Sequence, residues 1–194
     1  DRDFQNLMHV YLDAVFYPNI YKKEEIFRQE GWNYHLEKKE GPLKYNGVVY
    51  NEMKGVYSSI DGIASRVTAQ SLFPDTTYQY ESGGDPEHIP ELTYEEYLDF
   101  HRRYYHPSNS FIYLYGDMDM SERLDWIDEN YLGKYDKLDI DSSIEHQSSF
   151  DKTYELVKEY AISDNEIEEE SAMLTSNYVI GDNLDAKLML AFKV

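Results

Sequence analysis

The 194-residue chain contains no cysteine. This absence excludes disulfide bonds, zinc sites built from thiolates and catalysis by a cysteine nucleophile. Long apolar runs are missing too, because no stretch approaches the roughly 18 consecutive residues typical of a transmembrane helix. We therefore expect a soluble protein with no membrane partner, which would be cytoplasmic if its source is bacterial.

Positive charge is also scarce. The chain has 18 Lys and Arg against 38 Asp and Glu, which gives a formal net charge of −20 at pH 7. Such a surface would repel phosphate backbones, so we expect no nucleic-acid partner. Two interpretations of the charge stay open: it keeps the protein soluble, or it attracts cationic partners such as basic peptides.

Apolar residues make up 41% of the sequence, which is enough for a packed core. Apolar residues three and four apart, together with capping residues and breakers, predict helices, and short alternating or apolar runs predict strands. The expected helices cover 3–17, 22–30, 93–105 and 121–133, with a last one from about Leu184. The expected strands cover 32–37, 110–115, 154–161 and 171–180. The strand at 110–115 is expected to be buried on both faces.

Residues 46–73 carry one continuous helical stripe. Its apolar members step by four and three residues: Val49, Met53, Val56, Ile60, Ile63 and Val67. Ser58 and Asp61 also fit a capping box, which would begin a new helix. Either one long helix runs through the segment or the helix breaks near Ser58, and the capping pattern favours the break.

Two polar stretches lie in the C-terminal part. Residues 136–153 have no periodicity and predict a linker. The acidic run Asp164–Glu170 separates the last two expected strands, and a solvated turn explains it better than a metal site does.

Histidines in a zinc-binding arrangement are absent as well. A zinc peptidase site needs three protein ligands and an open position for water. In the motif H-x-x-E-H, one helix supplies two His ligands and the Glu that acts as base. None of the six histidines stands in this motif; His88 with Glu91 comes nearest, but no His follows Glu91. The chain also has no G-x-S-x-G motif, so we expect no catalytic residue within it.

Glu52 is the acid whose surroundings stand out. If its helix continues, the positions three, seven and ten residues further on share its face, and these are Gly55, Ser59 and Gly62. Glycine inside a helix costs about 1 kcal/mol relative to Ala, so two on one face indicate a close approach. Two interpretations stay open: a carboxylate aimed at a partner, or an ordinary helical Glu beside close-packed glycines.

The segment Gly47–Gly55, Gly-Val-Val-Tyr-Asn-Glu-Met-Lys-Gly, resembles a segment of the presequence proteases. These belong to the pitrilysin/insulinase superfamily of zinc metallopeptidases, and the segment carries their third zinc ligand. The resemblance continues in order through Leu72–Tyr78, Ser82–Pro86, Ile89–Thr93, Phe100–Asn109, Tyr115–Asp117, Tyr178–Asp182 and Leu188–Phe192. It covers nearly the whole chain, and several motifs in order are more specific than any one of them.

The resemblance implies an α+β fold with helices packed on a mixed or antiparallel sheet. It implies a long polypeptide of four related domains whose two halves enclose a chamber, in which unstructured peptides are cleaved. Residues 1–135 would be the C-terminal part of the first, zinc-site domain. Residues 136–153 would be a linker, and residues 154–194 would begin the second domain.

The resemblance also makes Glu52 the distal ligand of a catalytic Zn²⁺, with Tyr45, Asn51, Gly55 and Ser59 as possible surroundings. Many members of the superfamily carry a helper Glu seven residues before the distal ligand, where this chain has Tyr45. The presequence-protease branch tends to lack that acid, too. The two His ligands and the catalytic Glu would lie before Asp1 in the longer polypeptide, so the chain by itself is expected to be inactive.

The expected partners are peptide substrates and the remainder of the same polypeptide. Two alternatives stay open: a non-catalytic interaction or assembly domain of the same superfamily, and an independent acidic module that binds basic peptides.

Overall fold

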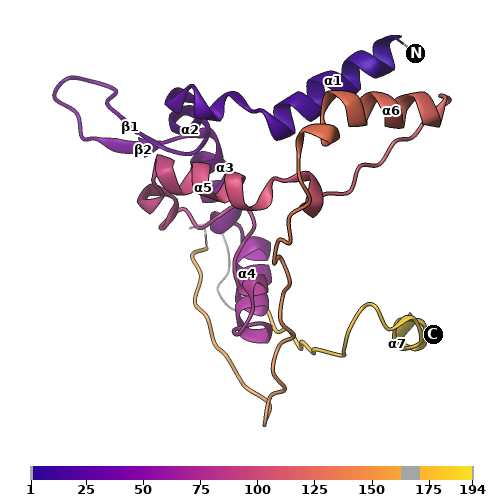
Figure 1. Ribbon diagram of the computed structural model, residues 1–194. Coiled ribbons are helices and arrows are strands. Elements are labelled where there is room, and N and C mark those ends of the chain that lie inside the picture. Colours follow the sequence, from indigo (N-terminus) through magenta and orange to yellow (C-terminus); the bar gives the residue numbers. More distant parts are fainter. Residues whose placement is uncertain (1, 163–170, 194) are drawn as a thin grey trace. The chain divides into compact units, whose positions relative to one another are not determined.

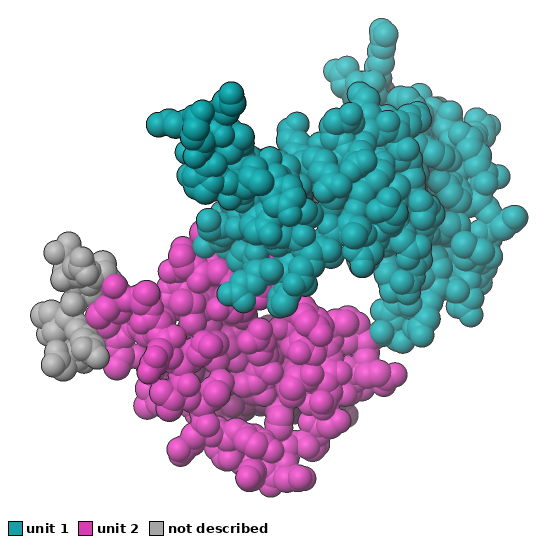
Figure 2. All heavy atoms as spheres, turned by 90° about the vertical axis from the view of Figure 1, so that its left-hand side faces the viewer, with its two compact units in different colours: residues 1–54, 86–143 teal, residues 55–85, 144–194 magenta. Residues whose placement is uncertain are grey.

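The computed structural model describes residues 2–162 and 171–193 (Figure 1). The chain divides into two compact units, drawn in different colours in Figure 2. Unit 1 comprises residues 1–54 and 86–143, and unit 2 comprises residues 55–85 and 144–194.

The core of unit 1 lies between two helices that run side by side in Figure 1, α1 (Arg2–Phe16) and α6 (Met120–Asn130). The helix expected at 3–17 is thus confirmed as α1, and the apolar stripe that predicted it buries Met8, Leu12 and Phe16. From the other side, Ile127 and Tyr131 enter the same cluster, and only 1% of Ile127 is exposed.

Helix α6 begins earlier than the sequence indicated. Asp119, and not Ser121, is its N-cap, because the Asp119 carboxylate accepts a hydrogen bond from the backbone N–H of Glu122 at 3.1 Å. The helix ends at Asn130, and Gly133 lies in the 3₁₀ turn η5 (Leu132–Lys134) that follows.

The rest of unit 1 joins short helices to a small hairpin. Its elements are η1 (Asn19–Tyr21), α2 (Glu24–Glu30), β1 (Asn33–His35), β2 (Lys44–Asn46), η3 (Ile89–Glu91), α5 (Tyr94–Tyr104) and η4 (Pro107–Asn109). Phe27 of α2 is buried against Tyr97 of α5, with ring centroids 5.3 Å apart. His101 of α5 donates through Nε2 to the Val15 carbonyl at 2.9 Å, which ties α5 to the end of α1.

Strands β1 and β2 pair antiparallel, with Tyr34 opposite Tyr45. This hairpin is the one sheet in the described part of the chain, so the α+β class is confirmed, whereas no larger mixed sheet is present there. β1 confirms the strand expected at 32–37 over its central three residues.

The expected break in the segment 46–73 is confirmed. Helix α3 (Val48–Ser58) ends one residue before helix α4 (Ile60–Leu72) follows. The N-cap is Ser59 and not Ser58: Ser59 is extended, and its Oγ accepts from the N–H of Gly62 at 3.0 Å. Ser58 instead donates to the Gly55 carbonyl at 2.8 Å, which closes the last turn of α3.

Three expected strands are absent from the described residues. Segments 110–115, 154–161 and 171–180 have no ladder partner there and form no regular structure. Burial of 110–115 on both faces was therefore wrong: Phe111 is fully exposed, while Leu114 packs against the α1–α6 core. Apolar alternation alone does not make a strand, because its backbone groups need a neighbouring strand.

In unit 2, α4 is followed by η2 (Thr77–Gln79), and the chain ends in α7 (Ala186–Lys193). The side-chain amide of Gln147 accepts from the Asp75 backbone N–H at 3.0 Å and donates to its carboxylate at 2.6 Å. This double contact attaches part of the expected linker to the turn after α4. The acidic run Asp164–Glu170 lies outside the described residues, and no described helix is long and apolar enough to cross a membrane.

Gly47 and Gly55 give a matched pair of substitutions. A Cβ on Gly47 would lie 2.2 Å from the Gly31 carbonyl oxygen, whereas a Cβ on Gly55, inside α3, would meet nothing within 4 Å. We expect Gly47→Ala to destabilise the chain by about 1–3 kcal/mol through this clash. Gly55→Ala should stabilise it by about 0.5–1 kcal/mol, since Ala is the better helix former. Urea unfolding measures both, and equal effects would contradict the close approach at Gly47.

The capping box of α5 predicts a pH dependence. The backbone N–H and the hydroxyl of Thr93 both donate to the Glu96 carboxylate at 2.8 Å, which lowers the pKa of Glu96 below its ordinary 4.5. The stabilisation is therefore complete above about pH 4.5 and is lost as the pH falls through the lower pKa of the folded state. We expect Thr93→Ala to cost about 1 kcal/mol at pH 7 and less at pH 3, measured by urea unfolding. The same cost at both pH values would contradict this coupling.

Candidate functional site

Glu52 lies on α3, on the side of the helix that faces solvent. Its neighbours Tyr50 and Met53 are buried, with 9% and 7% of their surface exposed, and they fix which face of the helix turns inward. Tyr50 and Met53 are three residues apart and share one face of the helix, so Glu52, one residue before Met53, points away from that buried face. The Glu52 carboxylate is therefore presented outward from a helix that is anchored on its other side.

The start of α3 is fixed by contacts with the hairpin. Gly47 lies so close to the backbone of Gly31 and Trp32 that no side chain fits there. Its carbonyl accepts from the N–H of Asn51 at 3.0 Å, and the Asn51 side chain donates to Asn46 Oδ1 at 3.0 Å. Through these two hydrogen bonds Asn51, the residue before Glu52, connects the end of β2 to the first turn of α3.

Tyr45 belongs to an aromatic cluster that supports α3. Its ring lies 5.4 Å from Tyr34, 5.8 Å from Trp32 and 6.0 Å from Tyr50, centroid to centroid. The neighbouring Tyr34 raises the pKa of Tyr45, through charge repulsion and then a hydrogen bond. Where other members of the superfamily would place a helper acid, this chain therefore places an aromatic ring that packs on the buried Tyr50.

Gly55, Ser59 and Gly62 do not form one face with Glu52. The helix breaks between Gly55 and Ser59, and the Ser59 side chain is used as the cap of α4. A Cβ on Gly62 would lie 2.1 Å from the Val56 carbonyl oxygen, so this glycine permits the break itself. Of these three residues, only Gly55 has the open space beside it that the sequence predicts for the Glu52 face.

The residues that the structure describes do not by themselves form a zinc site. In residues 2–162 and 171–193, no three His, Cys, Asp or Glu side chains lie together as a metal would require. His88 and Glu91, the nearest approach to the zinc motif, are joined by an exposed hydrogen bond of 3.1 Å between His88 Nδ1 and the Glu91 carboxylate. Glu52 offers one carboxylate where a zinc peptidase needs three ligands.

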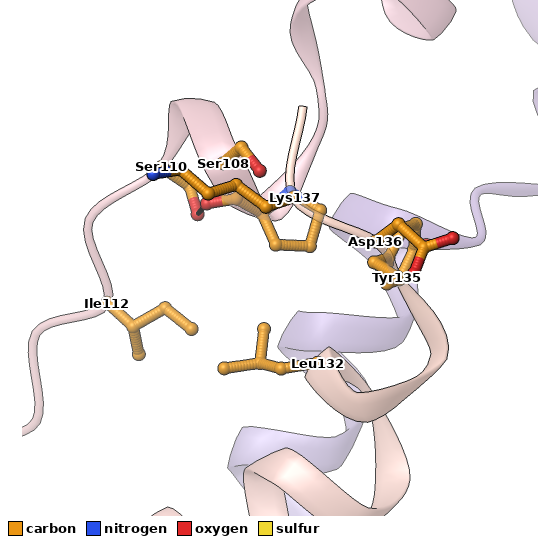
Figure 3. Close-up of a pocket in the computed structure, with 8 residues that line it drawn as sticks. Ser108, Ser110, Ile112, Leu132, Tyr135, Asp136 and Lys137 are labelled. Atoms are coloured by element: carbon orange, nitrogen blue, oxygen red, sulfur yellow. Dashed lines mark hydrogen bonds between the residues drawn. The ribbon is translucent and has the colours of Figure 1, made fainter. Parts of the chain in front are cut away.

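A cavity of about 430 Å³ lies elsewhere in unit 1 (Figure 3). In Figure 3, Ile112 and Leu132 face each other across it, with Ser108, Ser110 and Tyr135 at its rim. Burial raises the pKa of the Tyr135 hydroxyl above its ordinary value, and the hydroxyl is protonated at neutral pH. No local sequence pattern predicts this cavity, because it depends on how residues 110–112 pack beside η5.

The comparisons with known proteins agree with the family resemblance. The sequence pattern of the family described as the peptidase M16 inactive domain matches residues 91–194. The chain is 54% identical over 194 residues to "Protein HypA" of Clostridium perfringens, covering 100% of this chain and 20% of that protein.

Two presequence proteases are also similar. The chloroplastic/mitochondrial presequence protease 1 of Arabidopsis thaliana is 43% identical over 193 residues, which cover 98% of this chain and 18% of that protein. The mitochondrial presequence protease of Drosophila melanogaster is 43% identical over 160 residues, which cover 81% of this chain and 14% of that protein. The chain thus spans about a fifth or less of the length of these relatives. It belongs to the peptidase M16 family, in agreement with the resemblance to presequence proteases that its motifs indicate.

Proposed function

We propose that this chain is part of a zinc-dependent endopeptidase that degrades unstructured peptides in an enclosed chamber, and that Glu52 is one of its zinc ligands. The observation that carries the proposal is the outward-facing Glu52 on an anchored helix, within Asn-Glu-Met-Lys-Gly. The peptidase family membership supports it. Because the described residues do not complete a metal site, no catalytic step is assigned to them.

In this proposal each part of the chain has a separate role. Residues 1–135 end the first, zinc-site domain, residues 136–153 link it onward, and residues 154–194 begin the second domain. The two His ligands and the catalytic Glu come from the remainder of the polypeptide. The hairpin and the Tyr45–Tyr50 packing hold α3 at a fixed start, which matters because metal ligands need rigid support.

The proposed substrates are peptides. The net charge of −20 would favour cationic ones, and mitochondrial transit peptides are rich in Arg and poor in acids. This attraction acts over a Debye length of about 8–10 Å and weakens with salt.

A second candidate is a non-catalytic domain of the same family. It is favoured by the description of the matching family as an inactive domain. That match covers residues 91–194, however, and Glu52 lies outside it. An independent acidic peptide-binding module is the third candidate, and only the charge supports it.

The role of Glu52 is tested in the full-length protein with Glu52→Gln. We expect bound zinc, measured by metal analysis, to fall sharply, and peptidase activity to fall by at least about 100-fold. Loss of a metal ligand should cost more than the 10–100-fold typical of its supporting partners.

Glu129→Gln is the matched control, since Glu129 is an exposed acid on α6. It should leave zinc content and activity unchanged. Full zinc occupancy and full activity in Glu52→Gln would refute the proposed ligand role and would favour the non-catalytic candidate.

The isolated 194-residue chain gives a second test. Because Glu52 alone offers one ligand, we expect no zinc to be retained after gel filtration and no cleavage of an unstructured peptide. Stoichiometric zinc in the purified chain, or peptidase activity that a chelator abolishes, would contradict the proposal that the other ligands lie elsewhere.

A further inference from the structure

The junction between β2 and α3 contains a chemically labile dipeptide, Asn46–Gly47. Asn46 is the one asparagine in the sequence that a glycine follows. An asparagine side chain reaches the backbone N–H groups next to it, and a glycine, which has no Cβ, leaves its nitrogen open to close approach. The Gly47 nitrogen can therefore attack the carbonyl carbon of the Asn46 side chain, which makes Asn46 the asparagine of this chain most prone to deamidation.

Deamidation at this position takes two steps. The Gly47 amide gives up its proton to solvent, its nitrogen bonds to Asn46 Cγ, and Nδ2 leaves as ammonia, which closes a succinimide ring. Water then opens the ring at either carbonyl carbon, so the product at position 46 is aspartate or isoaspartate. Water is the only co-reactant, and a neutral amide is replaced by a carboxylate. In isoaspartate the backbone runs through the former side chain and is longer by one methylene.

The structure restrains both residues of the dipeptide. Asn46 pairs with Asn33 at the end of the β1–β2 ladder. Asn51 donates to both halves of the dipeptide, through its backbone N–H to the Gly47 carbonyl and through Nδ2 to Asn46 Oδ1, each at 3.0 Å. A succinimide ring needs Cβ and the next nitrogen nearly eclipsed about the Cα–C bond, whereas the extended backbone of a strand keeps them apart. Ring closure therefore requires the end of β2 to open.

The packing around Gly47 leaves no room for the isoaspartate product. Gly47 is buried, and an added Cβ would lie 2.2 Å from the Gly31 carbonyl oxygen and 2.8 Å from Trp32 Cα. A backbone lengthened by one methylene at this point cannot keep these contacts. Isoaspartate at position 46 would therefore displace the start of α3, the helix that carries Glu52.

We propose that Asn46 is a deamidation site and that Asn51 slows its conversion by holding the Asn46 side chain and the Gly47 carbonyl. Conversion then proceeds only while the junction is open, so the local opening equilibrium sets its rate. The site and its protection stand apart from the proposed function. One consequence rests on that function: if Glu52 is the proposed zinc ligand, isoaspartate at position 46 would also lower the zinc content.

Peptide mass analysis of the full-length protein, incubated in mildly alkaline buffer, tests the site. We expect Asn46 to convert at least about tenfold more slowly than in a free peptide of residues 43–50, because the junction must open first. Asn51→Ala removes one neutral hydrogen bond and should speed the conversion about 2–10-fold. No conversion in the peptide, the peptide's rate in the folded protein, or no acceleration in Asn51→Ala would overturn the inference.

Ser142→Ala is the matched control for Asn51→Ala. Ser142 Oγ donates at 2.8 Å to Oδ1 of another asparagine of unit 1, Asn109. Its loss should leave the conversion rate at Asn46 unchanged. Equal acceleration in both variants would overturn the role of Asn51, since general destabilisation would then explain the rate.

A melting experiment separates the change in backbone from the change in charge. The isoaspartate form, isolated by ion exchange through its added charge, should melt several degrees below the unconverted protein, because the packed backbone at Gly47 cannot absorb a methylene. Asn46→Asp adds the same charge without lengthening the backbone, and its carboxylate still accepts from Asn51, so it should melt close to the unconverted protein. An isoaspartate form that melts like Asn46→Asp would overturn the packing argument. Neither measurement involves zinc, so failure here is distinguishable from failure of the proposed function.

Discussion

A helix satisfies its own backbone N–H and C=O groups, whereas an extended segment depends on a neighbour for them. Most of the structure follows from this difference. Helices α1, α3, α5 and α6 form within about two residues of where the sequence indicates them. Side-chain N-caps begin α5 and α6, and apolar residues of α1 and α3 are buried. The hairpin forms because β1 and β2 are close in sequence and provide each other's partner. Segment 110–115 has the composition of a strand but no partner in the described chain, and it stays open on one side.

The same hairpin decides how Glu52 is presented. Close approach of Gly47 to the Gly31 backbone sets where α3 starts, and the burial of Tyr50 and Met53 sets its rotation. Tyr45 connects the two through its contacts with Tyr34 and Tyr50. If Glu52 is a metal ligand as proposed, the aromatic packing around Tyr45 and Tyr50 would hold its helix in place. The open side of α3 at Gly55 is where a further segment has room to approach.

Family membership and geometry together lead to the functional proposal. Membership in the peptidase M16 family supports a role in peptide hydrolysis, and the proposal assigns Glu52, exposed on α3, a part in it. A single carboxylate does not make a zinc site, so the proposal places the other ligands in further segments of the polypeptide. Segment 110–115 is consistent with this proposal. Within the described part of the chain, residues 111–115 make no backbone hydrogen bond, and the aromatic side chains of the segment are exposed.

The sequence by itself determined the helices, the break between α3 and α4, the capping box of α5 and the family, because these depend on local periodicity, local hydrogen bonds or ordered motifs. It misplaced the caps at Ser59 and Asp119 by one and two residues, since more than one residue near each helix start has a side chain suited to an N-cap. Only the tertiary structure decided that Gly47 and Gly62 are packed while Gly55 is open. It also decided that Tyr45 packs among aromatic rings and that 110–115 is exposed on one face. These features depend on residues far apart in sequence, and no local pattern encodes which of them meet.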